Sequence, residues 1–145
     1  MQSVVLQTVI KLLLPFIQVY GLYIIFHGHI SPGGGFAGGA VMAASFVLFA
    51  MSYGVGEGFK RLPRLIAQWL ESLGGLIYIA LGLTGILRGA AFLTNVPEWL
   101  GQAGQLFSAG LIPLLTTAIG LKVCSTIVTL LYHLLEEGHY DSQTD

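Results

Sequence analysis

Four long apolar stretches alternate with short polar segments along the chain. They cover residues 3–27, 34–54, 67–93 and 106–135. Each is about as long as the 20 mainly apolar residues that a helix needs to cross a hydrocarbon core of ~30 Å. The ~10-residue alternating segments of a membrane β-barrel are missing. The pattern predicts an all-α integral membrane bundle of four transmembrane helices, formed as a single domain over residues 1–145.

The composition supports a membrane protein. The chain is 54% hydrophobic and 9% charged, whereas a soluble domain usually carries about 25% charged residues. A net charge of −1 leaves no basic excess for nucleic-acid binding. The N-terminus lacks the basic region of a secretory signal, so we expect the first apolar stretch to be retained as a helix.

Lysine and arginine are distributed unevenly between the two ends of the predicted helices. With four spans, both termini and the middle loop lie on one side, where Lys60, Arg61 and Arg64 are found. The opposite side has Arg88 alone. Because short basic loops stay in the cytoplasm, we expect a multi-pass protein of the cell membrane with both termini cytoplasmic.

A polar stripe runs along the fourth predicted helix, around Lys122. An ionisable group at the centre of a span costs about 2.5–3.5 kcal/mol on insertion scales, so it is a candidate functional site. At 100° per residue, the residues that share its face are Ser125, Thr126, Thr129 and His133. The stripe indicates an ion or proton path. Two alternatives stay open: Lys122 could bond backbone carbonyls while the hydroxyls tie helices together, and His133 could be an ordinary interfacial residue.

The first predicted helix carries a second stripe of Gln7, Lys11, Pro15 and Gln18. Lys11 is a candidate for the same ion path. It lies only about 12 Å inside the expected membrane boundary, so its side chain could instead extend to the headgroups. Its expected partner is Glu71, at the start of the third predicted helix.

Glycines mark two predicted packing surfaces. On the third predicted helix, one side is formed by Gly75, Gly82, Gly85 and Gly89, which predicts close approach of a neighbouring helix. At the start of the second, the pairs Gly34/Gly38 and Gly35/Gly39 are spaced four apart and predict packing of backbone against backbone.

The loop before the second helix has two patterns that suggest other chemistry. Gly33, Gly35 and Gly38 match the dinucleotide pattern G-x-G-x-x-G, but that fingerprint needs a preceding β-strand rather than a membrane helix. His27 and His29 have no further His, Asp or Glu near them in sequence. We therefore expect no metal site and no cofactor.

The same loop resembles a known family signature. The residues that match it are Gly28, His29, Pro32, Gly33, Gly34, Gly35, Phe36, Gly38 and Gly39. They are similar to the motif of the MnhB/MrpB family, which comprises small four-span subunits of multisubunit Na⁺/H⁺ (Mrp-type) antiporters. The resemblance extends from the first span through the fourth and includes Pro113 and the stretch Gly120–Val123.

The resemblance implies a transport subunit without catalysis of its own, packed against other membrane subunits of an antiporter module that carries Na⁺ and H⁺. It also leaves a second host open, because the family occurs in the sodium-translocating modules of membrane-bound hydrogenases. Any redox activity would then belong to other subunits. A third possibility is a purely structural subunit, in which the Gly28–Gly39 loop is a docking element.

Overall fold

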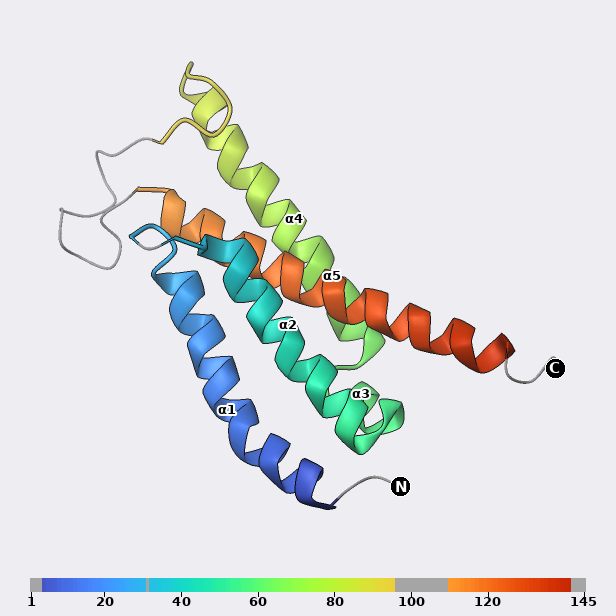
Figure 1. Cartoon of the computed structure of the whole chain (residues 1–145). Coiled ribbons are helices and arrows are strands. Elements are labelled where there is room, and N and C mark those ends of the chain that lie inside the picture. The colour runs from blue at the N-terminus through green and yellow to red at the C-terminus, as the bar shows by residue number, and fades with distance from the viewer. Residues whose placement is uncertain (1–3, 31, 96–109, 142–145) are drawn as a thin grey trace.

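The computed structural model describes residues 4–30, 32–95 and 110–141, and all regular structure in these ranges is helical (Figure 1). Four helices are long and apolar enough to cross a membrane, so the predicted all-α membrane fold is confirmed. A fifth, short helix lies between two of them. The helices are α1 (Val4–Phe26), α2 (Gly34–Tyr53), α3 (Val55–Arg61), α4 (Arg64–Leu87) and α5 (Ile112–Asp141).

The helix α4 begins and ends earlier than predicted. It begins at Arg64 rather than at residue 67, because the carbonyl of Pro63 accepts the first helical hydrogen bond, 3.0 Å from the backbone N–H of Ala67. It ends at Leu87 rather than at residue 93, because the chain turns at Gly89. That residue has a φ of 75°, which glycine adopts without steric cost.

The middle loop and α5 also differ from prediction. The segment expected as a loop contains α3, separated from α2 by Gly54, whose φ of 92° interrupts the helix. α5 begins at Ile112 rather than at residue 106, and residues 96–109 lie outside the described part of the chain. Beyond the predicted end at residue 135, α5 continues to Asp141.

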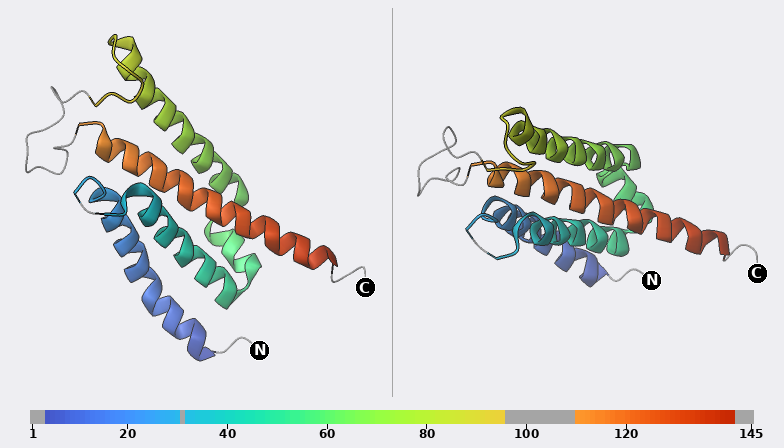
Figure 2. Two further views of the ribbon diagram at one scale, coloured as in Figure 1. Left: turned by 45° about the horizontal axis from the view of Figure 1, so that its top comes forward. Right: turned by 90° about the horizontal axis from the view of Figure 1, so that it is seen from above.

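The four long helices form a layer rather than a closed ring. Their order across the layer is α1, α2, α5, α4, since α2 packs on α1 and α5, and α5 packs on α2 and α4 (Figure 2). α1 and α4 therefore lie at opposite edges. The described ends of the chain lie at the same end of the layer as α3, and the α1–α2 loop lies at the opposite end (Figures 1 and 2). Which side is cytoplasmic stays a prediction.

Glycines bring α2 into close contact with both neighbours. A Cβ on Gly38 would come within 2.9 Å of the backbone carbonyl of Gly21 in α1. A Cβ on Gly39 would come within 2.6 Å of the carbonyl of Gly120 in α5, and Gly35 meets the carbonyl of Thr116. Gly35, Gly38 and Gly39 thus lie close to the backbone of neighbouring helices of this chain, whereas a Cβ on Gly34 would lie 3.8 Å from the carbonyl of Gly28 in the loop.

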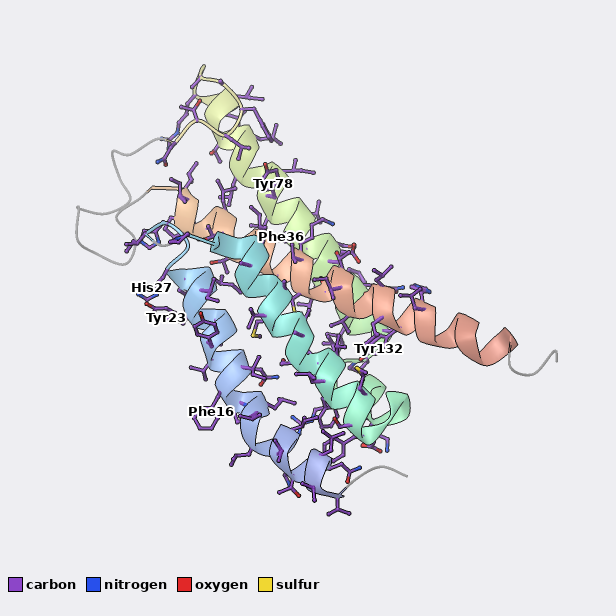
Figure 3. All side chains as sticks on the ribbon, in the orientation of Figure 1. Phe16, Tyr23, His27, Phe36, Tyr78 and Tyr132 are labelled. Carbon is purple, nitrogen blue, oxygen red and sulfur yellow. The ribbon has the colours of Figure 1, made fainter. Side chains whose placement is uncertain are left out.

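The packed interior is small and lies toward the end of the layer that carries the termini. Ala43, Val128 and Tyr132 are at most 1% exposed and form its centre. The hydroxyl of Tyr132 donates to the carbonyl of Leu62, 3.2 Å away, and so links α5 to the α3–α4 connection. Most other large apolar side chains point outward, as Phe16 does in Figure 3. Such a surface suits contact with lipid or with other membrane helices.

Candidate functional site

An ion pair joins α4 and α5 within the candidate membrane spans. Lys122 Nζ lies 3.7 Å from Oε1 of Glu71. The Thr126 hydroxyl, one turn further along α5, donates to the same oxygen at 2.9 Å. Gly74 allows the two helices to approach here, because a Cβ at this position would lie 3.0 Å from Cβ of Lys122. We call Glu71, Lys122 and Thr126 the Glu71 cluster.

The cluster lies away from the ends of both helices. Glu71 is the eighth residue of α4, about 10 Å from the beginning of the helix, and Lys122 is the eleventh of α5, about 15 Å from its beginning. The expected pairing of Glu71 with Lys11 is wrong. Lys11 is on α1, at the other edge of the layer from α4, so the two side chains are separated by α2 and α5.

The polar stripe of α5 divides between two environments. Lys122 and Thr126 face Glu71 of α4. Ser125 is only 2% exposed and lies on the same face of α5 as the buried Val128. Its hydroxyl donates to the carbonyls of Leu121 and Lys122 in its own helix. Ser125 is therefore a packed residue rather than a member of the cluster.

Two further stripe residues lie toward the C-terminal end of α5. The Thr129 hydroxyl oxygen is buried and has no hydrogen-bond partner in the described part of the chain. His133 is exposed one turn later. Arg64, the first residue of α4, lies at about the level of His133. This follows because α4 and α5 are antiparallel and Glu71 lies beside Thr126. Polar groups thus continue from the cluster toward the end of the layer that carries the termini.

The cluster is incompletely covered by this chain. The Lys122 side chain is 49% exposed and that of Glu71 30% exposed. Charged groups inside a membrane almost always face protein or a water-filled cavity, because lipid cannot solvate them. We therefore expect protein or water beyond the described residues to cover this side of α4 and α5.

On α1, the polar stripe makes different contacts. The Gln7 side-chain amide donates to the carbonyl of Ser52 at 3.2 Å, and the Tyr53 hydroxyl donates to the carbonyl of Gln7 at 2.9 Å. These bonds fasten the N-terminal part of α1 to the end of α2. Lys11 is exposed and lies beside α3 in a hollow of about 330 Å³. Pro15 lies inside α1, where it leaves the Lys11 carbonyl without its helical donor.

The motif loop positions the start of α2. Gly33 and Gly34 have φ values of 122° and 57°, and α2 begins at Gly34. His27 stacks on Tyr23 with ring centroids 4.2 Å apart (Figure 3), whereas both ring nitrogens of His29 are buried without a hydrogen-bond partner in the described residues. Phe36 is 67% exposed on α2. Pro32 is exposed as well, and Ser31 lies outside the described residues.

The predicted glycine face of the third membrane helix does not meet a neighbouring helix. Gly75 and Gly89 have open space where a Cβ would be. Gly82 and Gly85 contact Phe92 and Ala91, which belong to the turn that folds back after α4. At Gly82 and Gly85 the prediction was wrong because it did not foresee this turn, whereas contact of Gly75 and Gly89 with a helix of another subunit stays a prediction. The sequence prediction also missed Gly74, the glycine at the α4–α5 contact.

No group of three or more His, Cys, Asp or Glu side chains that could hold a metal occurs among the described residues. The α1–α2 loop follows a helix and no strand, so the dinucleotide pattern lacks its structural context. The chemistry available at the cluster is that of a carboxylate, an ammonium group and a hydroxyl.

A family model described as a domain related to the MnhB subunit of Na⁺/H⁺ antiporter matches residues 5–129. The chain belongs to the MnhB family. The relatives include a putative antiporter subunit mnhB2 of Staphylococcus aureus, 30% identical over 133 residues, which cover 91% of this chain and 94% of the relative. An MnhB-family membership and four apolar helices together establish a multi-pass membrane protein.

Two other matches are longer proteins. An uncharacterized protein of Methanocaldococcus jannaschii is 37% identical over 114 residues, which are 75% of this chain and 43% of that protein. A chain of the membrane-bound sulfane sulfur reductase (MBS), an archaeal respiratory membrane complex, is 38% identical with a TM-score of 0.77. The match covers 92% of this MnhB-family chain and 58% of that one. The chain thus spans about half the length of these two relatives.

Proposed function

We propose that this chain is a non-catalytic membrane subunit of a multisubunit Na⁺/H⁺ antiporter module, and that the Glu71 cluster forms part of the cation or proton path. The observation that carries the proposal is the half-exposed Lys122–Glu71 pair inside two candidate membrane spans. The match to the MnhB family and the similarity to a putative antiporter subunit support a role in ion transport.

The chemistry of the cluster suits ion exchange. A carboxylate can hold a proton or a sodium ion, and a nearby ammonium group competes with both for the same oxygen. Thr126 supplies a hydroxyl that orients Glu71 whichever partner is bound. From this cluster, Thr129 and His133 extend the polar side of α5 toward the termini. Lys11, on the far edge of the layer, lies outside this path.

Four helices arranged in a layer do not enclose a path, so we propose that sister subunits form part of it. The exposed side of the cluster is the surface that such a subunit or a water-filled route would cover. Phe36 and the other exposed residues of the motif loop lie at the opposite end of the layer from α3 and offer a separate contact surface.

Replacing Lys122 tests the path. In the assembled complex, Lys122→Met and Lys122→Ala should lower Na⁺-dependent proton exchange in inverted vesicles while complex abundance stays the same. Arg88→Ala is the matched control, because it removes a cation from an exposed position just beyond α4. Wild-type exchange in a fully assembled Lys122→Ala complex would rule out the path and leave a structural role.

The MBS match favours a second host, the ion-pumping module of a respiratory complex. A mild-detergent pull-down at native expression, followed by mass spectrometry, separates the two. Antiporter-like subunits alone would indicate a stand-alone exchanger, whereas accompanying iron–sulfur subunits would indicate a redox-driven complex. Recovery of the chain alone would contradict both hosts.

A further inference from the structure

A second group of charged residues lies at the end of the layer that carries the termini, on helices other than α4 and α5. Its residues line the hollow of about 330 Å³ between α1, the end of α2 and α3. The hollow is lined by four charged residues, Lys11, Glu57, Lys60 and Arg61, and by two aromatic residues, Phe49 and Tyr53. Three cations face one carboxylate, which leaves an excess of positive charge.

Two of these cations have no acidic partner in the described part of the chain. Lys60 is paired with Glu57 in an ion pair one helical turn apart. Arg61 instead lies over the Phe49 ring, with its guanidinium carbon 4.8 Å from the ring centroid. That contact holds the guanidinium in place without neutralising it. The ammonium group of Lys11 is the second unneutralised cation.

The hollow is a fixed feature of the fold. Its α1 and α2 walls are joined by the two hydrogen bonds between Gln7 and the Ser52–Tyr53 segment. The ring of Tyr53 stacks on that of Phe49, with centroids 4.7 Å apart, so both aromatic side chains are held as well. An anion entering the hollow would therefore meet the Arg61 guanidinium already held against the Phe49 ring.

The surroundings indicate a lipid rather than a soluble anion. On α1, Leu12 and Phe16 follow Lys11 and are each 68% exposed, so the hollow opens beside an apolar, lipid-facing surface. Lys11 is the eighth residue of α1, about 10 Å from its described beginning, a depth at which a long side chain can reach the headgroup region. Basic pockets of this kind between membrane helices bind phospholipid headgroups.

We propose that this hollow binds the phosphate group of an anionic phospholipid, with Lys11 and Arg61 as its cationic contacts. Arginine suits phosphate because its planar guanidinium donates two parallel hydrogen bonds. Lys60 is shared with Glu57 and contributes less. The site is independent of the transport path, so its test does not depend on the proposed function.

Native mass spectrometry of the full chain in mild detergent tests the site. The chain is titrated with an equimolar mixture of phosphatidylglycerol and phosphatidylcholine, and the ratio of bound lipids is measured. Wild type should prefer phosphatidylglycerol. Lys11→Gln and Arg61→Gln should each lower that preference about fivefold, the factor expected for one basic residue near a membrane surface.

Two control variants keep the result decisive. Glu57→Gln removes the one carboxylate of the hollow and should raise the preference, a gain that misfolding would not produce. Arg88→Gln, beyond the other end of the membrane helices, should leave it unchanged. The proposal is overturned if Lys11→Gln and Arg61→Gln bind like wild type. It is equally overturned if wild type binds phosphatidylglycerol and phosphatidylcholine equally.

Discussion

Glu71 and Lys122 approach each other from antiparallel helices, and 3.7 Å separates the carboxylate oxygen Oε1 from Nζ. The same oxygen accepts the hydroxyl of Thr126. Placing a charged pair inside two apolar helices costs free energy, so the pair marks a candidate functional site. Both side chains are partly exposed and can therefore contact groups outside the described residues.

Neutralising the carboxylate should separate transport from assembly. Glu71→Gln leaves a similar volume and removes the charge that Lys122 faces. Glutamine lacks the charge that binds a proton or Na⁺, and a loss of about 1.4 kcal/mol in that binding weakens it tenfold, so we expect exchange to fall roughly tenfold or more. The measurement is the Na⁺-induced change in a pH gradient across vesicles, scaled to the amount of assembled complex. Restoration of activity by the double exchange Glu71→Lys with Lys122→Glu would show that the pair itself matters.

The hydroxyl of Thr126 can be tested with a threonine of the same helix as its control. Thr126→Val removes the bond to Glu71, whereas Thr117→Val removes a bond to the carbonyl of Pro113 within α5. We expect the first change to lower exchange several-fold and the second to leave it near wild type. Equal effects of the two substitutions would show that Thr126 acts only through its helix.

Thr129 offers a test in which stability and activity move in different directions. Its buried hydroxyl has no partner in the described residues, so Thr129→Val removes an unsatisfied polar group at nearly constant volume. The free energy of unfolding should stay the same or rise by about 1 kcal/mol. If the hydroxyl belongs to the ion path, exchange should nevertheless fall. Thermal unfolding in detergent and vesicle exchange measure the two effects, and unchanged exchange would remove Thr129 from the path.

Glycine substitutions should distinguish packing contacts from open positions. Gly39→Val places a side chain against the backbone of Gly120, which cannot move aside without separating α2 from α5. Overpacking of this kind destabilises by about 1–3 kcal/mol or more. Gly75→Ala, in open space on α4, should be neutral or slightly stabilising because alanine favours helix. The amount of folded chain and its melting temperature report both changes, and similar melting temperatures would contradict the packing described.

Much of the fold could be predicted from the sequence, because a membrane helix is specified by the length and hydropathy of its own segment. The glycine pairs at the start of α2 were also predictable, since their spacing is local. Less of the candidate site could be predicted from the sequence. Glu71 was assigned to Lys11 because one sequence does not reveal that α5 lies between α2 and α4. Gly82 and Gly85 were assigned to a helix contact because nothing in their spacing indicates that the Ala91–Phe92 turn folds back onto them.

The order of the helices in the layer has a consequence for biosynthesis. During translation α1 and α2 can pair as soon as both are made, but α4 packs mainly on α5, which is synthesised after it. Until α5 leaves the ribosome, α4 lacks this packing partner and Glu71 lacks Lys122, the residue with which it pairs. The Glu71 cluster can therefore form only after α5 has entered the bilayer.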